Sequence, residues 1–339
     1  MSAPVPVDMV FTYVDGADPA HRAKRLSYGG VAAPGPGDGG PEATAERERW
    51  YLGVGEITFS VRSVLRWLPW IRTIHVVTDA QRPPVDPELI SSGRVRVVDH
   101  AEIVPDRYRP VFASTIIESC LHRIPGLSDV WLYDNDDYMH FGPVPAETFV
   151  NAGRGGGVVL SLKAYRARVR DLLRAVSGVM PGFVPRANPY TMGISNAYRA
   201  LRRRAGVPRG EILVPRHATQ VYRKATAERL EEQFAEELHR NRELRFRSRE
   251  QVSYSTLAYT MEKRWHPEDR VRLWNPLDPD PDIRVYDFLH CRRPGSCERK
   301  WRAVFASDAR LACLNNVPLF ERDRFLETMR LKGLGEALT

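Results

Sequence analysis

Residues 130–137 read VWLYDNDD, an apolar run that ends in a dense acidic cluster. The apolar part is typical of a buried strand, and the acidic part marks the polar edge where that strand stops. Open α/β sheets bind ligands at the carboxyl ends of their strands, and carboxylates gathered there repel one another unless a cation or a proton joins them. Such oxygen ligands suit Mg²⁺ or Mn²⁺. The stretch therefore predicts a metal-assisted site; a turn rich in Asp and Asn is the alternative interpretation.

The segments before this stretch alternate between strand and helix patterns. Strands are predicted at 8–14, 73–78 and 95–98, and helices at 55–67 and 114–123, the second with Ser114 as its N-cap. This alternation predicts an α/β fold with a mostly parallel sheet and helical crossovers. Several strands end in acidic residues, namely Asp15, Asp79, Asp99 and residues 134–137. We therefore expect carboxylates along one edge of the sheet.

The second half of the chain is predicted to be more helical, with a largely helical segment at 190–265. Amphipathic spacing predicts one helix over 219–238, and a second is expected over 251–265. The other elements predicted from pattern are strands at 158–162, 283–289 and 311–314 and a helix at 320–331.

Length and composition are those of a globular protein. The 339 residues are 43% hydrophobic and 27% charged; they could form one large domain or two smaller ones, and we expect a single catalytic domain, 1–339. Residues 29–44 are rich in Gly, Pro and Ala, which predicts a flexible loop. No apolar stretch is long enough to cross a bilayer, and residues 1–7 lack a secretory pattern. The expected location is the cytoplasm, with peripheral association at the inner face of the membrane as an alternative.

The four cysteines have no zinc-like spacing and are expected to be reduced core residues. A disulfide between Cys291 and Cys297 is the alternative.

The net charge is +8, and arginine supplies nearly all of the basic excess. Nucleic acid, an anionic membrane or a phosphate-bearing substrate would suit such a charge, although a GC-rich genome also favours arginine. The arginines are scattered among acidic residues, and the sequence has no recognised nucleic-acid motif, so we expect no nucleic-acid partner.

Four blocks follow one another in an order that is typical of a known family. They are residues 8–18 (DMVFTYVDGAD), segments between Glu56 and Asp137, residues from His217 through Phe246-Arg247-Ser248, and residues 313–316 (CLNN). On these blocks the chain resembles the Stealth family of sugar-1-phosphate transferases, which includes bacterial capsule polymerases and the animal GlcNAc-1-phosphotransferase. The resemblance implies a nucleotide-diphospho-sugar transferase-like (GT-A-like) fold.

The resemblance also implies a reaction. An acceptor hydroxyl of a saccharide attacks the phosphorus next to the sugar in a nucleotide-diphosphate sugar such as UDP-GlcNAc. Sugar-1-phosphate is transferred, a phosphodiester forms, and a nucleoside monophosphate leaves, as in cell-surface polysaccharide synthesis. A conventional metal-dependent glycosyltransferase, which would release a nucleoside diphosphate, is the alternative.

Site residues follow from the same matches. Metal ligands are expected at Asn135, Asp136 and Asp137, with Mg²⁺ or Mn²⁺ as the cofactor. Catalytic roles are expected for His217, as general base, and for Asp8, Asp15, Asp137 and Arg247. Substrate contacts are expected at Arg62, Asp79, Ser114 and Glu118, where ordinary structural bonding is the alternative. Asp8 on its own reads as a residue at the start of a strand, and Arg247 as a solvated charge.

One position departs from the family pattern. The fourth block usually ends Asn-Asp, but here it ends Asn315-Asn316. A neutral amide cannot replace a carboxylate as a charged ligand, so we do not expect a catalytic role for Asn316.

Overall fold

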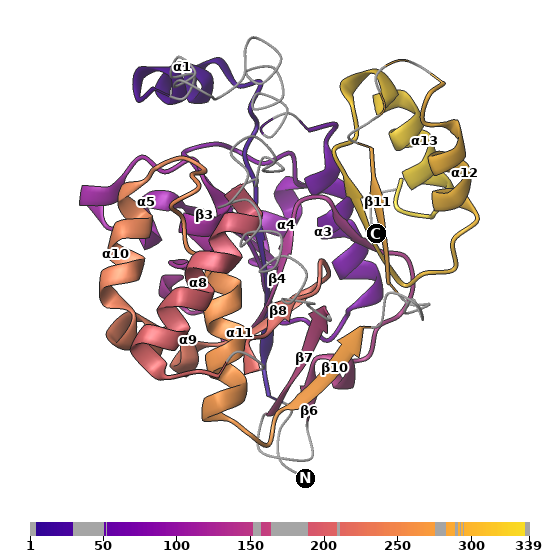
Figure 1. The fold of residues 1–339 in the computed structure, drawn as a ribbon. Coiled ribbons are helices and arrows are strands. Elements are labelled where there is room, and N and C mark those ends of the chain that lie inside the picture. Colours follow the sequence, from indigo (N-terminus) through magenta and orange to yellow (C-terminus); the bar gives the residue numbers. More distant parts are fainter. Residues whose placement is uncertain are drawn as a thin grey trace, which may run out of the picture.

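The computed structural model describes residues 5–29, 51, 53–151, 157–163, 189–208, 211–274, 283–288, 291, 293 and 295–335. Its centre is a five-stranded sheet in the order β3-β2-β1-β4-β9 (Figure 1). The strands are β1 (Val7–Thr12), β2 (Ile74–Thr78), β3 (Val95–Asp99), β4 (Val130–Asn135) and β9 (Gln220–Arg223). Strands β1 to β4 are mutually parallel, whereas β9 runs antiparallel to β4. The predicted α/β fold with a mostly parallel sheet is confirmed.

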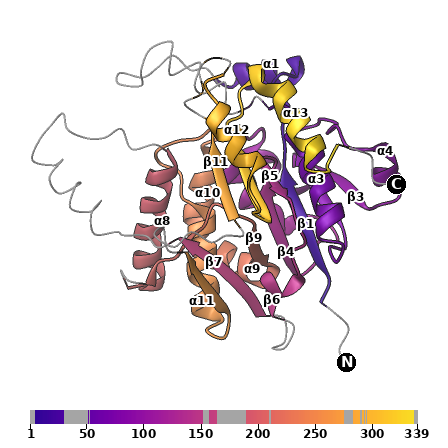
Figure 2. The ribbon, with the colours of Figure 1, turned by 90° about the vertical axis from the view of Figure 1, so that its right-hand side faces the viewer.

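Helices lie on both sides of this sheet (Figures 1 and 2). One group consists of α8 (Pro189–Ala205), α9 (Lys224–Gln233), α10 (Ala235–Glu243) and α11 (Tyr254–Trp265). The other side holds α3 (Glu56–Trp67), α12 (Glu298–Phe305) and α13 (Arg322–Leu331). Helix α3 packs Ile57, Val61 and Val64 into the main core, as its helical spacing predicts.

Shorter helices connect the strands. They are α1 (Pro19–Ser27), α4 (Pro87–Ser91), α5 (His100–Ile103) and α6 (Ser114–Glu118), with 3₁₀ turns at Asp106–Tyr108, Leu121–Arg123, Ala146–Thr148 and Leu319–Glu321. Asp18 caps α1 by accepting a hydrogen bond from His21 N. In the described part of the chain no helix is both long and apolar enough to cross a membrane.

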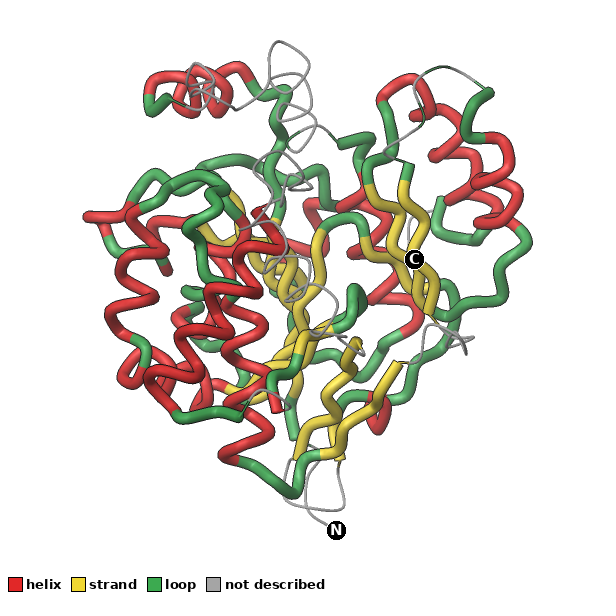
Figure 3. The backbone as a smooth tube through the Cα atoms, viewed as in Figure 1, coloured by secondary structure: helices red, strands yellow, loops and turns green. Residues whose placement is uncertain are grey.

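Two smaller sheets flank the central one (Figure 3). The first contains β6 (Val150–Asn151), β7 (Gly157–Lys163), β8 (Val214–Pro215) and β10 (Arg270–Trp274). The second contains β5 (Tyr138–His140), β11 (Ile283–Asp287) and β12 (Leu311–Asn315). Because β12 pairs antiparallel with β5, Leu311 to Cys313 lie directly beside Tyr138 to His140, which follow the acidic cluster.

Some predicted elements differ from those observed. The helix predicted over 219–238 is wrong at its start, since Gln220–Arg223 is strand β9, and the helical run is divided between α9 and α10. Helix α6 begins at Ser114, so its N-cap is Ala113 and the predicted Ser114 cap is wrong. Apart from Gly29, the predicted loop at 29–44 lies outside the described residues.

The prediction for the cysteines also requires correction. Cys291 and Cys297 form a disulfide, with Cα atoms 5.6 Å apart, and both lie in a core shared with α12 and α13. Cys120 and Cys313 are buried free thiols.

Candidate functional site

The carboxyl ends of the parallel strands meet at one edge of the central sheet. Asp15 follows β1, Asp79 follows β2, and Asp136 and Asp137 follow β4. Strand β9 is antiparallel, so it begins at this edge, where Gln220 pairs with Tyr133. That reversal brings His217, three residues before β9, to the acidic cluster.

Three carboxyl groups form the centre of this edge: Asp136, Asp137 and Glu56. Burial raises the pKa of Asp136 well above its usual range, and the charges of Glu56 and Asp137 raise it further. Burial likewise raises the pKa of Glu56 to about 7, although the N–H of Val54 donates to its Oε2 at 2.7 Å. Sequence reasoning missed Glu56, which opens the second family block but reads as an ordinary acid at the start of a helix.

A buried thiol links the acidic cluster to His217. Sγ of Cys313 donates to Oδ2 of Asp137 at 3.4 Å and lies 3.3 Å from Nε2 of His217. The imidazole also makes an edge-to-face contact with Tyr138, with ring centroids 5.2 Å apart. Burial raises the pKa of Asp137, and the positive charge that His217 carries when it is protonated lowers it. Cys313 therefore contacts both Asp137 and His217, although the three residues are far apart in the sequence.

Arg247 and Glu118 lie on the other flank of the cluster. Burial raises the pKa of Glu118 to about 7, while the charge of Arg247 and a hydrogen bond with Tyr133 lower it. The charge of Arg247 also lowers the pKa of Asp137. Phe246, next to Arg247, stacks on Phe112 with centroids 4.8 Å apart, which fixes the loop that carries the arginine.

The donor set of the cluster fits a hard divalent cation. No group of three or more His, Cys, Asp and Glu side chains within the described ranges is already arranged as a metal site. However, Oδ1 of Asp137 is buried without a hydrogen-bond partner among the described residues, and it lies among carboxyl groups that repel one another. The amide oxygen of Asn135 is already engaged, since it accepts a hydrogen bond from Tyr133 at 2.9 Å. Oε2 of Glu56 likewise accepts one hydrogen bond, from Val54, so Glu56 and Asn135 each keep oxygen lone pairs that could bind a cation.

Asp8 does not reach this edge. It lies near the amino end of β1, opposite Trp131, and its side chain is fully buried. Both of its carboxylate oxygens accept from Arg72, at 2.9 and 2.6 Å, and Oδ2 also accepts from the N–H of Ser128 at 2.8 Å. The structure thus supports the strand-start interpretation of Asp8 over a role in chemistry.

The remaining predicted residues are dispersed. Arg62 donates to the carbonyl of Leu334, at the C-terminal end of the described chain. Asp79 is at the acidic edge but pairs with Lys24 at 2.9 Å, beside His21 and His100. The exposed Asp15 accepts from the N–H of Ala17 in a local turn. Ser114 is half-buried at the start of α6, one helical turn before Glu118.

Residues 50–156 match the family model described as Stealth protein CR2, conserved region 2. The chain carries a Stealth region. The predicted resemblance is confirmed, and the Stealth region contains both Glu56 and the acidic cluster. The fourth-block position Asn316 adopts a left-handed backbone conformation, φ 60°, which asparagine tolerates. It donates to Asp287 at 3.0 Å.

Several known proteins are similar to this chain in sequence. The chain is 33% identical over 258 residues to an exopolysaccharide phosphotransferase of Streptomyces coelicolor, covering 75% of this chain and 39% of the relative. It is 32% identical over 256 residues to the exopolysaccharide phosphotransferase CpsY of Mycobacterium tuberculosis, covering 75% and 43%. It is 34% identical over 171 residues to the capsular polysaccharide phosphotransferase cps12A of Actinobacillus pleuropneumoniae, covering 49% and 43%. The chain therefore spans about two-fifths of the length of these relatives.

Two solved structures that resemble it are glycosyltransferases. The galactosyltransferase LgtC, in complex with donor and acceptor sugar analogues, is 10% identical with a TM-score of 0.38, covering 96% of this chain and 95% of that one. Mouse xyloside xylosyltransferase 1 is 13% identical with a TM-score of 0.34, covering 93% and 99%. Likeness at this level says nothing about activity.

Proposed function

We propose that this chain transfers sugar-1-phosphate from a nucleotide-diphosphate sugar, such as UDP-GlcNAc, to a hydroxyl of a saccharide acceptor. A phosphodiester forms, and a nucleoside monophosphate leaves. The process served is cell-surface polysaccharide synthesis, which the printed names of the relatives support. The observation that carries the proposal is the contact chain from Asp137 through Cys313 to His217, because it joins a base to an acidic, cation-attracting cluster.

The contact chain determines which nitrogen of His217 can act as the base. Burial raises the pKa of Cys313 well above its usual range, so the thiol keeps its proton and donates it to Asp137. The sulfur is then the acceptor in its contact with His217, and we propose that Nε2–H of His217 donates to it. In the neutral ring of this tautomer the lone pair is on Nδ1. We propose that Nδ1 takes the proton of the attacking hydroxyl.

In this proposal the charged groups around the base bind the phosphoryl group and neutralise its charge. Arg247 has the donor fork that matches phosphate oxygens, and we propose that it holds the transferred phosphate. Asp136, Asp137 and Glu56 would hold Mg²⁺ or Mn²⁺, which when bound neutralises charge on phosphoryl oxygens. We propose Glu118 and Asp15 as further contacts to the donor.

We propose that the chain acts as one catalytic unit, in the cytoplasm or at the inner face of a membrane. Its partners in this proposal are the nucleotide sugar and the saccharide acceptor, without nucleic acid.

The test uses two variants and product analysis. We expect His217→Ala to lower the single-turnover rate about 10²–10⁴-fold while nucleotide-sugar affinity is retained, because the base acts on the acceptor. His266→Ala is a matched control, since this half-buried histidine pairs with Glu268 at the end of α11. Release of nucleoside diphosphate by the wild type would contradict the reaction. An unchanged rate for His217→Ala would contradict the assignment of the base.

A further inference from the structure

The backbone around His217 makes a tight turn. The N–H of Ala218 donates to the carbonyl of Arg216 at 3.0 Å, which makes His217 the central residue of a γ-turn. Before the turn, the N–H of Arg216 donates to the carbonyl of Ser161 on β7, also at 3.0 Å. After the turn, the chain is anchored through the side chain of Thr219. The direction of the imidazole therefore depends on both ends of this short segment.

The anchor of Thr219 is a buried carboxylate at the end of β4. Oγ1 of Thr219 donates to Oδ2 of Asp134 at 3.1 Å, and both residues are buried. They lie one position beyond Gln220 and Tyr133, which pair between β9 and β4. Burying a carboxylate is costly unless it is hydrogen-bonded, so the hydroxyl and the carboxylate stabilise each other's placement. This directed bond fixes the end of the turn that the backbone bonds leave open.

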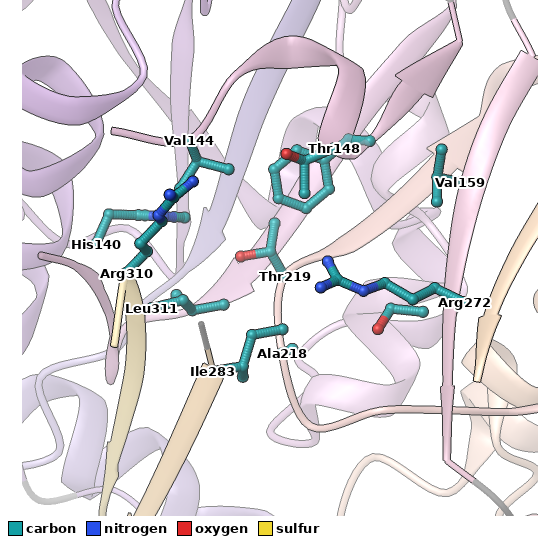
Figure 4. Close-up of a pocket in the computed structure, with 12 residues that line it drawn as sticks. His140, Val144, Thr148, Val159, Ala218, Thr219, Arg272, Ile283, Arg310 and Leu311 are labelled. Carbon is teal, nitrogen blue, oxygen red and sulfur yellow. The ribbon is translucent and has the colours of Figure 1, made fainter. Parts of the chain in front are cut away.

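The same carboxylate also contacts His140. Nε2 of His140 lies 3.5 Å from Oδ2 of Asp134, and both side chains are fully buried. In Figure 4 the hydroxyl of Thr219 points toward the side of the pocket where His140 lies. His140 ends β5, which pairs antiparallel with β12, the strand that carries Cys313. One carboxylate thus connects the turn of His217 with the strand pair that holds the thiol beside its ring.

We propose that Thr219 is a positioning residue for His217. The inference rests on the proposed function, in which His217 is the base and Cys313 contacts its Nε2. The hydroxyl of Thr219, held by Asp134, keeps Nε2 at the thiol and presents Nδ1 to the attacking hydroxyl. Loss of the hydroxyl leaves the backbone bonds of the turn in place but removes this anchor, so the ring adopts more than one orientation. A displacement of about 1 Å can cost on the order of 10²-fold in rate.

The first measurement is the transfer rate. Thr219→Val keeps the shape of the side chain and removes the hydroxyl, so kcat should fall about 10-fold or more at unchanged donor affinity and unchanged acceptor KM. Thr219→Ser keeps the hydroxyl and should stay within about two-fold of wild type. Thr226→Val is the matched control, because Thr226 is equally buried and donates to the buried carboxylate of Glu262, beyond the opposite end of β9. If the valine variant does not fold, Thr219→Ala takes its place with the same expectation.

The second measurement repeats the substitution in a protein without the base. Adding Thr219→Val to His217→Ala should change the residual rate by less than about two-fold, because a positioning residue has no effect once the group that it positions is gone. A further fall as large as that in the wild type would overturn the inference, since it would indicate general damage to the site. A raised acceptor KM at unchanged kcat would also overturn it, since it would make the hydroxyl a substrate contact in the pocket.

The third measurement follows the ring of His217 without turnover. Nitrogen-15 NMR of histidine-labelled protein, assigned with His217→Ala, reports which ring nitrogen carries the proton at a pH where the ring is neutral. Wild type and Thr219→Ser should show one form, with the proton on Nε2, whereas Thr219→Val should show a mixture. Identical spectra for wild type and the valine variant would overturn the positioning role. Failure of the wild type to release nucleoside monophosphate would count against the proposed reaction alone, because the spectra need no substrate.

Discussion

Replacing Asp8 with asparagine separates a structural role from a catalytic one. The carboxylate is fully buried and accepts hydrogen bonds from Arg72, His75 and the backbone of Ser128. Burial alone would raise the pKa of Asp8, but these hydrogen bonds outweigh it and hold the pKa well below its usual range. The variant keeps the shape and removes the charge, so it directly weakens the bonding between β1, β2 and the turn before β4.

The expected loss of stability can be estimated from the ion pair between Asp8 and Arg72. Removing one partner of a buried ion pair costs about 3–5 kcal/mol. The side chain of Arg72 is 45% exposed, so water screens its side of the pair, and we take the lower end, about 3 kcal/mol. With roughly 2–4 °C per kcal/mol, the melting temperature should fall by about 6–12 °C.

The dependence on pH gives a second signature of the same pair. Folding lowers the pKa of Asp8. Its contribution to stability is therefore fully present above its pKa in the unfolded chain, near 3.8, and is lost as the pH falls through its pKa in the folded protein. The difference in melting temperature between wild type and variant should be complete at pH 7 and should shrink below about pH 4.

Thermal unfolding and transfer are measured on the same preparations. Asp106→Asn is the matched control, because Asp106 also pairs with an arginine but its side chain is 90% exposed. The folded fraction of Asp8→Asn should keep donor binding and a transfer rate within a few-fold of wild type. A variant that melts like wild type but transfers nothing would refute the structural reasoning and return Asp8 to the catalytic group.

Four further outcomes are expected. Asp137→Asn should abolish transfer. It should also raise the melting temperature of the metal-free protein, because a buried charge that repels its neighbours is removed. Full turnover of the wild type in excess chelator would contradict the role of Asp137 as a metal ligand. Affinity for Mg²⁺ should increase as the pH rises through about 7, where the Glu56 carboxyl loses its proton, and calorimetry on Glu56→Gln should show a flatter dependence. Cys313→Ser should retain most of the transfer rate. Cys313→Val cannot bridge Asp137 and His217, so its kcat should fall about 10-fold while its donor affinity is unchanged. Equal transfer rates for the two variants would exclude the bridge. Gly16→Ala should lower the melting temperature by several degrees, since a Cβ there would lie 2.0 Å from the carbonyl oxygen of Tyr51, and an unchanged melting curve would count against that packing.

Local patterns predicted the parallel part of the sheet. Strands β1 to β4 are short apolar runs that stop at acidic residues, and both signals are contained within a few neighbouring residues. Strand β9 was missed because the helical spacing of Leu230 and Phe234 was extended back to Val221, although Val221 would lie on the opposite face of that helix. In addition, no turn residue separates Arg223 from α9. Only pairing with β4, a contact across about 90 positions of sequence, defines those residues as a strand.

Only the part of the candidate site that is local in the sequence could be predicted. The acidic residues after β4 were evident as a local cluster. The bond between Cys313 and Asp137 depends on pairing across 176 positions, for which the sequence has no local signal. Asp8 shows the opposite limitation: the family match identified the residue, but the burial that surrounds it with Arg72 and Ser128 depends on the tertiary fold.

The pairing of β12 with β5 has a consequence for biosynthesis. The N–H of Leu314 donates to the carbonyl of Asp137 at 2.9 Å, and Cys313 lies opposite Tyr138. The strand that completes the surroundings of the proposed base is therefore among the last described segments to leave the ribosome. A nascent chain with its first four strands already folded would display the acidic edge but would lack the thiol that orients His217. The proposed site would thus be complete only after synthesis has passed residue 315.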